Sequence, residues 1–407
     1  MQGDSLWMRV SLHYKRGMKM IKKIRTPLFF IVLTILVFVF FVINNTMENV
    51  DRDLEVKAEV LEVDDSNIVS NGIASIGNQT LLIEVLDGDY KGEKFYADNL
   101  LLGQLEMDNY YQVGDKIIAA LLIDKNTGAI RGAKAIDMFR QNSIIIMFSI
   151  FTILLVLFAK TVGIKALFSF VASLYIIWNF LVKRILEGND PIFTAVLTLV
   201  ILSAIIIFSV AGFTKKGISA FLGTIIGLLI TTVLTLVFGK EMGLMGMTQA
   251  YSMSVLINGN LNLNMLEVFY AAIIIGASGA AMDIAMDVSA SMKEIVEKKP
   301  EISEKELIKS GFNVGSAVIG TMTTTLLLAY SGGYLTLLML FMTKNSSFLR
   351  IINLKIVSAE IMRTLIGSIG LVIVAPITAL IAGNIYKFSK EQKKGEKREK
   401  IEESINY

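Results

Sequence analysis

The chain has 407 residues, of which 54% are hydrophobic and 18% charged, and its formal net charge is +3. A soluble domain carries about a quarter charged residues, so this composition excludes an ordinary soluble protein and indicates a membrane protein with several spans. The chain has no cysteine, which excludes disulfides, thiolate metal sites and thiol catalysis.

The charges are sorted by region. Residues 1–26 contain seven Lys or Arg and one acid, residues 45–138 contain 18 acids and eight Lys or Arg, and the tail after Asn384 contains seven Lys or Arg. Because basic flanks stay on the cytoplasmic side of a membrane, we expect both termini inside and residues 45–138 outside. The apolar run 27–43 lacks a small-x-small cleavage pattern, so residues 1–44 are predicted to be a basic N-terminus followed by an uncleaved anchor.

Residues 45–138 have the pattern of a β domain. Short alternating or branched runs, such as LEVKAEVLEV and KIIAALLI, are separated by turn signals that include Asn71-Gly72, Asp87-Gly88 and Gly114-Asp115. Short strands separated by regular turns in about 90 residues favour a small β-barrel or sandwich. We therefore predict a small extracytoplasmic β-barrel, similar to an OB-fold.

Residues 139–385 are predicted to form a mainly α-helical, polytopic membrane domain. With the anchor, eight spans are expected, which places both termini on one side. The seven spans of this domain are 143–159, 163–182, 191–212, 217–238, 265–288, 311–331 and 362–383.

Two segments between these spans are informative. Residues 334–342 are apolar but too short to cross a bilayer, so we expect them to be re-entrant or interfacial; whether 333–361 crosses is left open. Ser303 and Glu306 have the spacing of a capping box, which predicts a cytoplasmic helix that begins at Ser303 and continues into the next span. Residues 386–407 are predicted to be a charged cytoplasmic tail.

The run GASGAAMDIAMDVSASM, residues 276–292, contains two aspartates four residues apart, Asp283 and Asp287. On a helix they share one face with the smallest side chains, which include Gly276, Gly279 and Ala280. Small residues let membrane helices approach closely, so we expect this acid-bearing face to be the buried one. The next span has a similar stripe that contains Gly320, and Gly223 with Gly227 forms a GxxxG packing motif.

The last three spans therefore predict a polar seam. Its candidate pathway residues are Asp283, Asp287, Asn313, Thr324, Glu360 and Arg363. Ionisable groups inside membranes commonly mark ion or proton routes, so the aspartates are interpreted as ion or proton sites, Asn313 and Thr324 as polar ligands, and Glu360 with Arg363 as a gate or orienting pair. Two alternatives are left open: the aspartates lie near the cytoplasmic end and reach water, and Glu360 and Arg363 form a structural ion pair.

Intramembrane proteolysis is excluded by the same residues. Gly276-Ala277-Ser278-Gly279 is similar to the serine motif of rhomboid proteases, but the only histidine, His13, precedes the first apolar run. A serine without its base is not a nucleophile. The aspartyl intramembrane proteases carry their two acids on different helices, whereas Asp283 and Asp287 share one. We expect no enzymatic activity, no cofactor or metal, and no nucleic-acid partner.

Three blocks carry a family resemblance: GASGAAMDIAMDVSASM, GTMTTTLLLAYSGG and SAEIMRTLIGSIGLVIVAPITAL. Together they resemble the YibE/F family of bacterial membrane proteins over about residues 140–385, and the anchor and β domain fit full-length members. The resemblance implies a protein of the bacterial cytoplasmic membrane. It does not imply a particular activity. The family's second block usually has an asparagine at the position of Thr324.

From the residues we predict an ion- or proton-coupled transporter of unknown substrate. The alternative is a non-transporting scaffold or accessory factor for export or envelope assembly, which binds a partner through its β domain. The expected partners are the lipid bilayer and a solute or ion, with a second copy of the chain or a partner membrane protein left open.

Overall fold

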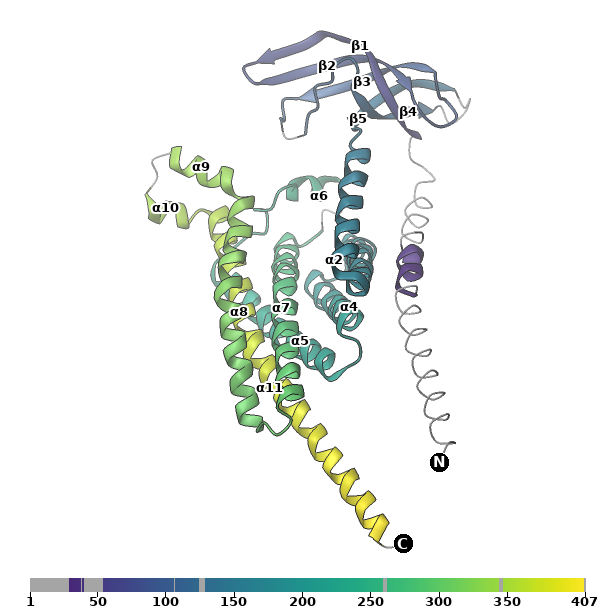
Figure 1. The fold of residues 1–407 in the computed structure, drawn as a ribbon. Helices are drawn as coiled ribbons and strands as arrows, with labels where there is room; N and C mark the ends of the chain where they lie inside the picture. The colour runs from purple at the N-terminus through teal and green to yellow at the C-terminus, as the bar shows by residue number, and fades with distance from the viewer. Residues whose placement is uncertain are drawn as a thin grey trace, which may run out of the picture. The chain divides into compact units, whose positions relative to one another are not determined.

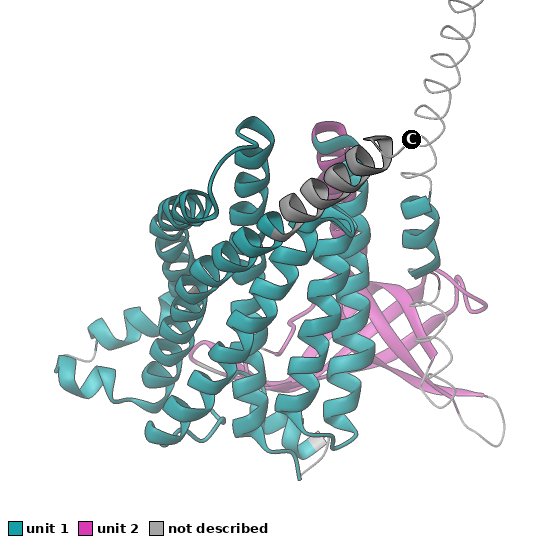
Figure 2. Ribbon diagram, turned by 90° about the horizontal axis from the view of Figure 1, so that it is seen from below, with its two compact units in different colours: residues 1–38, 159–407 teal, residues 39–158 magenta. Residues whose placement is uncertain are grey.

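The computed structural model describes residues 29–37, 39, 54–105, 107–123, 129–258, 262–343 and 347–405. The chain divides into two compact units, residues 39–158 and residues 1–38 with 159–407 (Figure 2). Of the predicted anchor, residues 29–37 are helical, and the rest of that prediction lies largely outside the described residues.

Five strands form a closed barrel. They are β1 (Leu54–Asn71), β2 (Ala74–Val85), β3 (Lys94–Leu102), β4 (Lys116–Ile123) and β5 (Ile130–Met138) (Figure 1). Their order around the barrel is β1-β2-β3-β5-β4, with β3 and β5 parallel and the other neighbours antiparallel. This is the strand order of an OB-fold. The predicted small barrel is confirmed.

The barrel interior is mainly apolar and contains a buried amide network. Val60, Leu81 and Ile117 are among its fully buried residues. Gln79 is also fully buried, and its Oε1 accepts hydrogen bonds from Asn99 Nδ2 at 3.0 Å and from the Tyr111 N–H at 3.1 Å. A buried amide is tolerated because its partners replace the hydrogen bonds that it made to water.

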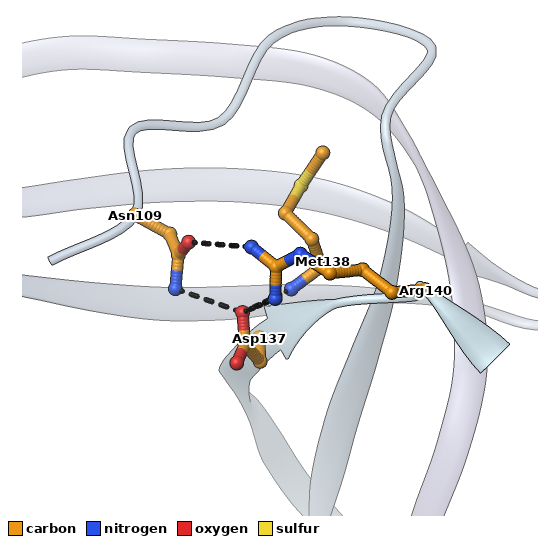
Figure 3. Close-up of polar contacts among 4 residues, drawn as sticks. All are labelled: Asn109, Asp137, Met138 and Arg140. Carbon is orange, nitrogen blue, oxygen red and sulfur yellow. Dashed lines mark hydrogen bonds and ion pairs between the residues drawn. The ribbon is translucent and has the colours of Figure 1, made fainter. Parts of the chain in front are cut away.

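A polar cluster joins the barrel to the helix that follows it (Figure 3). Asp137 Oδ1 accepts hydrogen bonds from Arg140 Nη1 at 2.7 Å, from the Met138 N–H at 2.7 Å and from Asn109 Nδ2 at 3.1 Å. Partial burial raises the pKa of Asp137, but the bonds from Arg140 and Met138 outweigh it and hold the pKa below its usual value. Only two residues separate β5 from the next helix, so this cluster fixes the last turn of the barrel.

The remaining elements are helical (Figure 1). They are α2 (Gln141–Ile176), the π-helical turn η1 (Ile177–Val182), α3 (Lys183–Leu186), α4 (Pro191–Ala211), α5 (Lys215–Glu241), α6 (Ser252–Asn258), α7 (Met265–Lys298), α8 (Glu304–Gly333), α9 (Leu335–Thr343), α10 (Phe348–Ile352) and α11 (Lys355–Ile405).

Within the described ranges, six helical stretches are long and apolar enough to cross a membrane. The predicted spans 143–159 and 163–182 lie in one of them, the 46-residue stretch Gln141–Leu186. Its backbone is non-helical at Lys160, with φ 50° and ψ −123°, which is where the sequence predicts the connection between the two spans. The expected number of eight spans is therefore not confirmed, although the apolar segments lie where they were predicted.

The connections after α7 agree with the sequence. Ser303 caps α8, because its Oγ accepts a hydrogen bond from the Glu306 N–H at 3.2 Å, as the capping box predicts. Helix α9 has nine residues, about 14 Å at 1.5 Å per residue, so it is too short to cross a bilayer.

Helices α5 and α11 approach each other through small residues. Gly223 lies against Thr378, Gly227 against Val374, and Thr231 against Gly370. The residue numbers of these contacts rise along α5 while those of their partners fall along α11. The two helices are therefore antiparallel, with one contact per helical turn. The GxxxG motif thus lies at a helix–helix contact.

Candidate functional site

The acid-bearing face of α7 is exposed in the single chain. Asp283 and Asp287 are exposed, as are Gly276 and Gly279, while Val288 is fully buried. The expectation that this face is the buried one is therefore wrong for one chain. The cause is that α7 carries small residues on more than one of its sides, and it contacts α4, α5, α8 and α11. A second set of small residues is the buried one: Ala277, Ser278, Ala281, Ala285 and Ser289.

Helix α8 also exposes its polar stripe. Asn313, Ser316, Gly320 and Thr324 are exposed. Its opposite side packs inward through two glycines: a Cβ on Gly311 would lie 2.6 Å from Met292 Sδ, and one on Gly315 would lie 2.9 Å from Ala375 Cβ. The stripe therefore points away from the bundle.

The contacts at these glycines fix how α7 and α8 align. Gly311 meets Met292 of α7, and a Cβ on Gly315 would lie 3.6 Å from Val288 of α7, so the two helices run antiparallel (Figure 1). Counting equal numbers of residues from the Gly315–Val288 contact places Asp287 level with Ser316 and Asp283 level with Gly320.

The same counting places Gly279 level with Thr324. Helix α7 exposes Gly276, Gly279, Asp283 and Asp287, and α8 exposes Asn313, Ser316, Gly320 and Thr324. Each of these polar stripes lies on the side of its helix away from the contact of Val288 with Gly315.

The polar groups of these two stripes have no partner in the part of the chain that the structure describes. The carboxylates of Asp283 and Asp287 make no hydrogen bond or ion pair there, and neither does the Asn313 amide. The hydroxyls of Ser316 and Thr324 lack even the bond to their own helix that Thr323 and Thr325 make. These groups are available to an ion, to water or to another protein surface.

Glu360 and Arg363 form a separate cluster at the start of α11. Arg363 Nη1 lies 3.5 Å from Glu360 Oε1, and the two side chains are only 17% and 13% exposed. The guanidinium also donates to Tyr334 Oη at 3.2 Å and lies 5.5 Å from the centre of the Phe269 ring.

This ion pair is distant from the aspartates. Phe269 precedes Asp283 by 14 residues on α7, which is about 21 Å along the helix. The structure therefore exposes Asp283 and Asp287 on α7 and Asn313 and Thr324 on α8, and leaves Glu360 with Arg363 at the other end of α7.

Sequence reasoning missed a set of buried hydroxyls in the bundle. Ser203 of α4, Thr224 of α5, Ser289 of α7 and Thr378 of α11 are buried, and their hydroxyls lack hydrogen-bond partners within the described residues. Most serines and threonines in spans bond to a carbonyl of their own helix, as Thr231 does. The sequence gives no signal that distinguishes the two kinds.

No group of three or more His, Asp or Glu side chains that could hold a metal ion occurs among the residues that the structure describes. The two carboxylates of α7 are oxygen ligands, which suit protons and hard cations.

Comparison with known families gives two matches. Residues 147–388 match the model described as YibE/F-like protein, and residues 55–137 match the YibE/F family N-terminal domain. No curated protein and no solved structure matches the chain. The two matches cover the barrel and the helical region, and so the chain belongs to the YibE/F-like family.

Proposed function

We propose that the protein is an ion- or proton-coupled transporter of the bacterial cytoplasmic membrane, with its barrel outside and both termini inside. The charge distribution supports this orientation, since residues 1–26 and the tail after Asn384 are basic, whereas residues 45–138 are acidic. Counting Gln141–Leu186 as two spans and adding the anchor gives eight crossings, which is the even number that this topology requires.

The observation that carries the proposal is the pair of unpartnered carboxylates on α7. Lys293, the first basic residue after them, lies ten residues beyond Asp283, about 15 Å along the helix. Asp283 thus lies inside the apolar part of α7. A carboxylate there costs about 2.5–3.5 kcal/mol on insertion scales, and such residues typically serve a transport route.

Each group is assigned a role in this proposal. Asp283 and Asp287 are one helical turn apart and bind the coupling proton or cation. Asn313 and Thr324 are exposed on α8 and supply neutral oxygen ligands along the pathway. Glu360 and Arg363, at the opposite end of α7, act as an orienting pair for the helix ends rather than as part of the ion site.

The proposal is tested in everted membrane vesicles in which respiration quenches an acridine dye. Adding Na⁺, K⁺, Mg²⁺ or Mn²⁺ salts is expected to restore fluorescence with at least one cation in vesicles that contain the protein, because an antiporter exchanges that cation for protons. Asp283→Asn is expected to abolish this response, since an amide cannot release a proton.

The matched control is Glu294→Gln, which neutralises an exposed acid on the same helix near its charged end. This variant is expected to retain the response. A response that is unchanged in Asp283→Asn contradicts the role of the aspartate, and no response to any of the four cations contradicts cation–proton exchange.

One observation favours the alternative scaffold function. Val69, Ile76 and Leu102 form a cross-strand row on the outer face of β1, β2 and β3, and they are 71%, 54% and 58% exposed. Adjacent exposed apolar side chains are typical of protein interaction sites.

Deleting residues 45–138 separates the two functions. A transporter is expected to keep part of its cation response in the vesicle assay, because the aspartates remain on α7. A scaffold is expected to lose its role completely, measured as failure of the truncated chain to rescue a strain that lacks the protein.

A further inference from the structure

One end of the barrel exposes a patch of apolar side chains. The patch extends from the tip of the β1–β2 hairpin to the loop that follows β3 (Figure 1), and we call it the barrel patch. Its members are each more than half exposed: Val69, Ile73, Ile76, Leu102, Leu105 and Met107. Contiguous exposed apolar surface is typical of a site that binds a protein or a membrane.

Strand pairing and one glycine make the patch continuous. Val69 pairs with Ile76, and Ile76 pairs with Leu102, so these three side chains form one row across three strands. Gly103 lies against the same row, because a Cβ there would be 3.1 Å from Ile76 Cγ1. The loop that carries Leu105 therefore begins next to the row.

The end of the hairpin carries no charge. Residues 66–78 contain no Asp, Glu, Lys or Arg, and the hydroxyls of Ser70 and Ser75 are hydrogen-bonded to each other at 3.1 Å. The hairpin thus offers a charged partner no ion pair. An uncharged apolar surface suits the boundary between lipid headgroups and acyl chains, where apolar side chains leave water without desolvating a charge.

The loop after β3 is held next to the start of α2 (Figure 3). Asn109, two residues beyond Met107, donates a hydrogen bond from Nδ2 to Asp137 Oδ1 at 3.1 Å, and its Oδ1 accepts one from Arg140 Nη2 at 3.5 Å. Arg140 directly precedes the 46-residue apolar stretch Gln141–Leu186. One side of the barrel patch therefore lies close to the residue at which the chain leaves the barrel for this stretch.

The strand directions place the rest of the patch at the same end of the barrel. Strand β4 is antiparallel to both β1 and β5, and β3 is parallel to β5, so β1, β3 and β5 run in one sense. Because the strands of a closed barrel share one tilt, these three strands finish at the same end. There β1 reaches the hairpin tip, β3 reaches the loop, and β5 leads into α2.

We propose that the barrel patch rests on the outer surface of the lipid bilayer, with Ile73, Leu105 and Met107 among the headgroups and the first carbons of the acyl chains. The inference rests on the membrane placement made in the proposed function, but it does not require transport. Under the scaffold alternative a partner protein would cover the same side chains. Lipid is favoured because α2 brings the bilayer to this end of the barrel, only two residues after β5.

Lipid contact is measured on the full chain reconstituted in phosphatidylcholine vesicles. The chain has no cysteine, so Ile73→Cys and, separately, Leu105→Cys each carry a single fluorophore. Phosphatidylcholine with a nitroxide close to its headgroup is expected to quench both labels, because side chains of interfacial segments lie about 5–10 Å deep. Iodide in the water is expected to quench them weakly.

Asp89→Cys is the matched control. Asp89 is exposed in the turn between β2 and β3, and this turn lies at the opposite end of the barrel because β2 is antiparallel to β1. Its label is expected to be open to iodide and to show about twofold less quenching by the nitroxide lipid, or lower still. Lipid quenching at Ile73 or at Leu105 that does not exceed the value at Asp89 overturns the proposal.

A photoreactive side chain in native membranes separates lipid from protein. With p-benzoylphenylalanine in place of Ile73, irradiation is expected to add the mass of one phospholipid to the chain, measured by mass spectrometry of the purified protein. The same residue in place of Asp89 is expected to add none. A cross-link to a second protein or to the chain's own helices without a lipid adduct overturns the proposal, and so does the absence of any adduct.

The two proposals fail separately. Labels that lipid quenches, in a chain without any cation response, would remove the proposed transport and leave the patch on the bilayer. A cation response from a chain whose labels lipid does not quench would do the reverse.

Discussion

Gly223→Leu is expected to disrupt the bundle by separating α5 from α11. A Cβ at this position would lie 2.9 Å from Thr378 Cβ and 3.0 Å from its Cα, and it would also overlap Thr378 Oγ1. The obstacle is partly backbone, which cannot move aside as a flexible side chain does. Overpacking typically costs 1–3 kcal/mol, and we expect at least about 3 kcal/mol here because leucine adds three further carbons. The measurement is the unfolding temperature of the full chain in detergent.

Gly332→Leu is the control for this prediction, since the same side chain meets open space on α8. Its unfolding temperature is expected to stay within a degree or two of the original, because leucine is also a better helix former than glycine. Equal losses in the two variants would show that leucine itself, and not the contact with Thr378, is responsible.

Arg363→Met is expected to destabilise the full chain by about 3–5 kcal/mol, because it leaves the Glu360 carboxylate without its partner in a nearly buried site. The double variant Glu360→Gln/Arg363→Met is expected to recover most of this loss, since no charge is then left unpaired. The original chain, Arg363→Met, Glu360→Gln and the double variant form a double-mutant cycle, measured as the free energy of unfolding in a mixed-micelle denaturation.

The exposed ion pair between Lys293 and Glu297 on α7 is the control for this cycle. Its atoms lie 3.4 Å apart and its side chains are about half exposed, so Lys293→Met is expected to cost less than about 0.5 kcal/mol. If the double variant is no more stable than Arg363→Met, the loss comes from the contacts of Arg363 with Tyr334 and Phe269 rather than from the unpaired acid.

The helices and strands of this fold can be predicted from local signals in the sequence. Turn signals and alternating runs predict the barrel, which depends on period-two side chains and on residues such as Gly72 and Gly114 that adopt positive φ. Uninterrupted apolar runs predict the helices, and Ser303 predicts the start of α8 through a hydrogen bond to a residue three positions away. Each of these signals acts between neighbours along the chain, and for that reason each can be seen without a structure.

Which side of α7 is buried could not be predicted from such local signals. The sequence alone determined that Asp283 and Asp287 share one side of a helix, because helical geometry fixes it. Only the tertiary structure decided that this side is exposed, because burial depends on which helices pack against α7. Small residues surround most of α7 in its second half, so residue size favours no single face there, and the contacts of Val288 and Met292 with α8 and α11 fill the other sides.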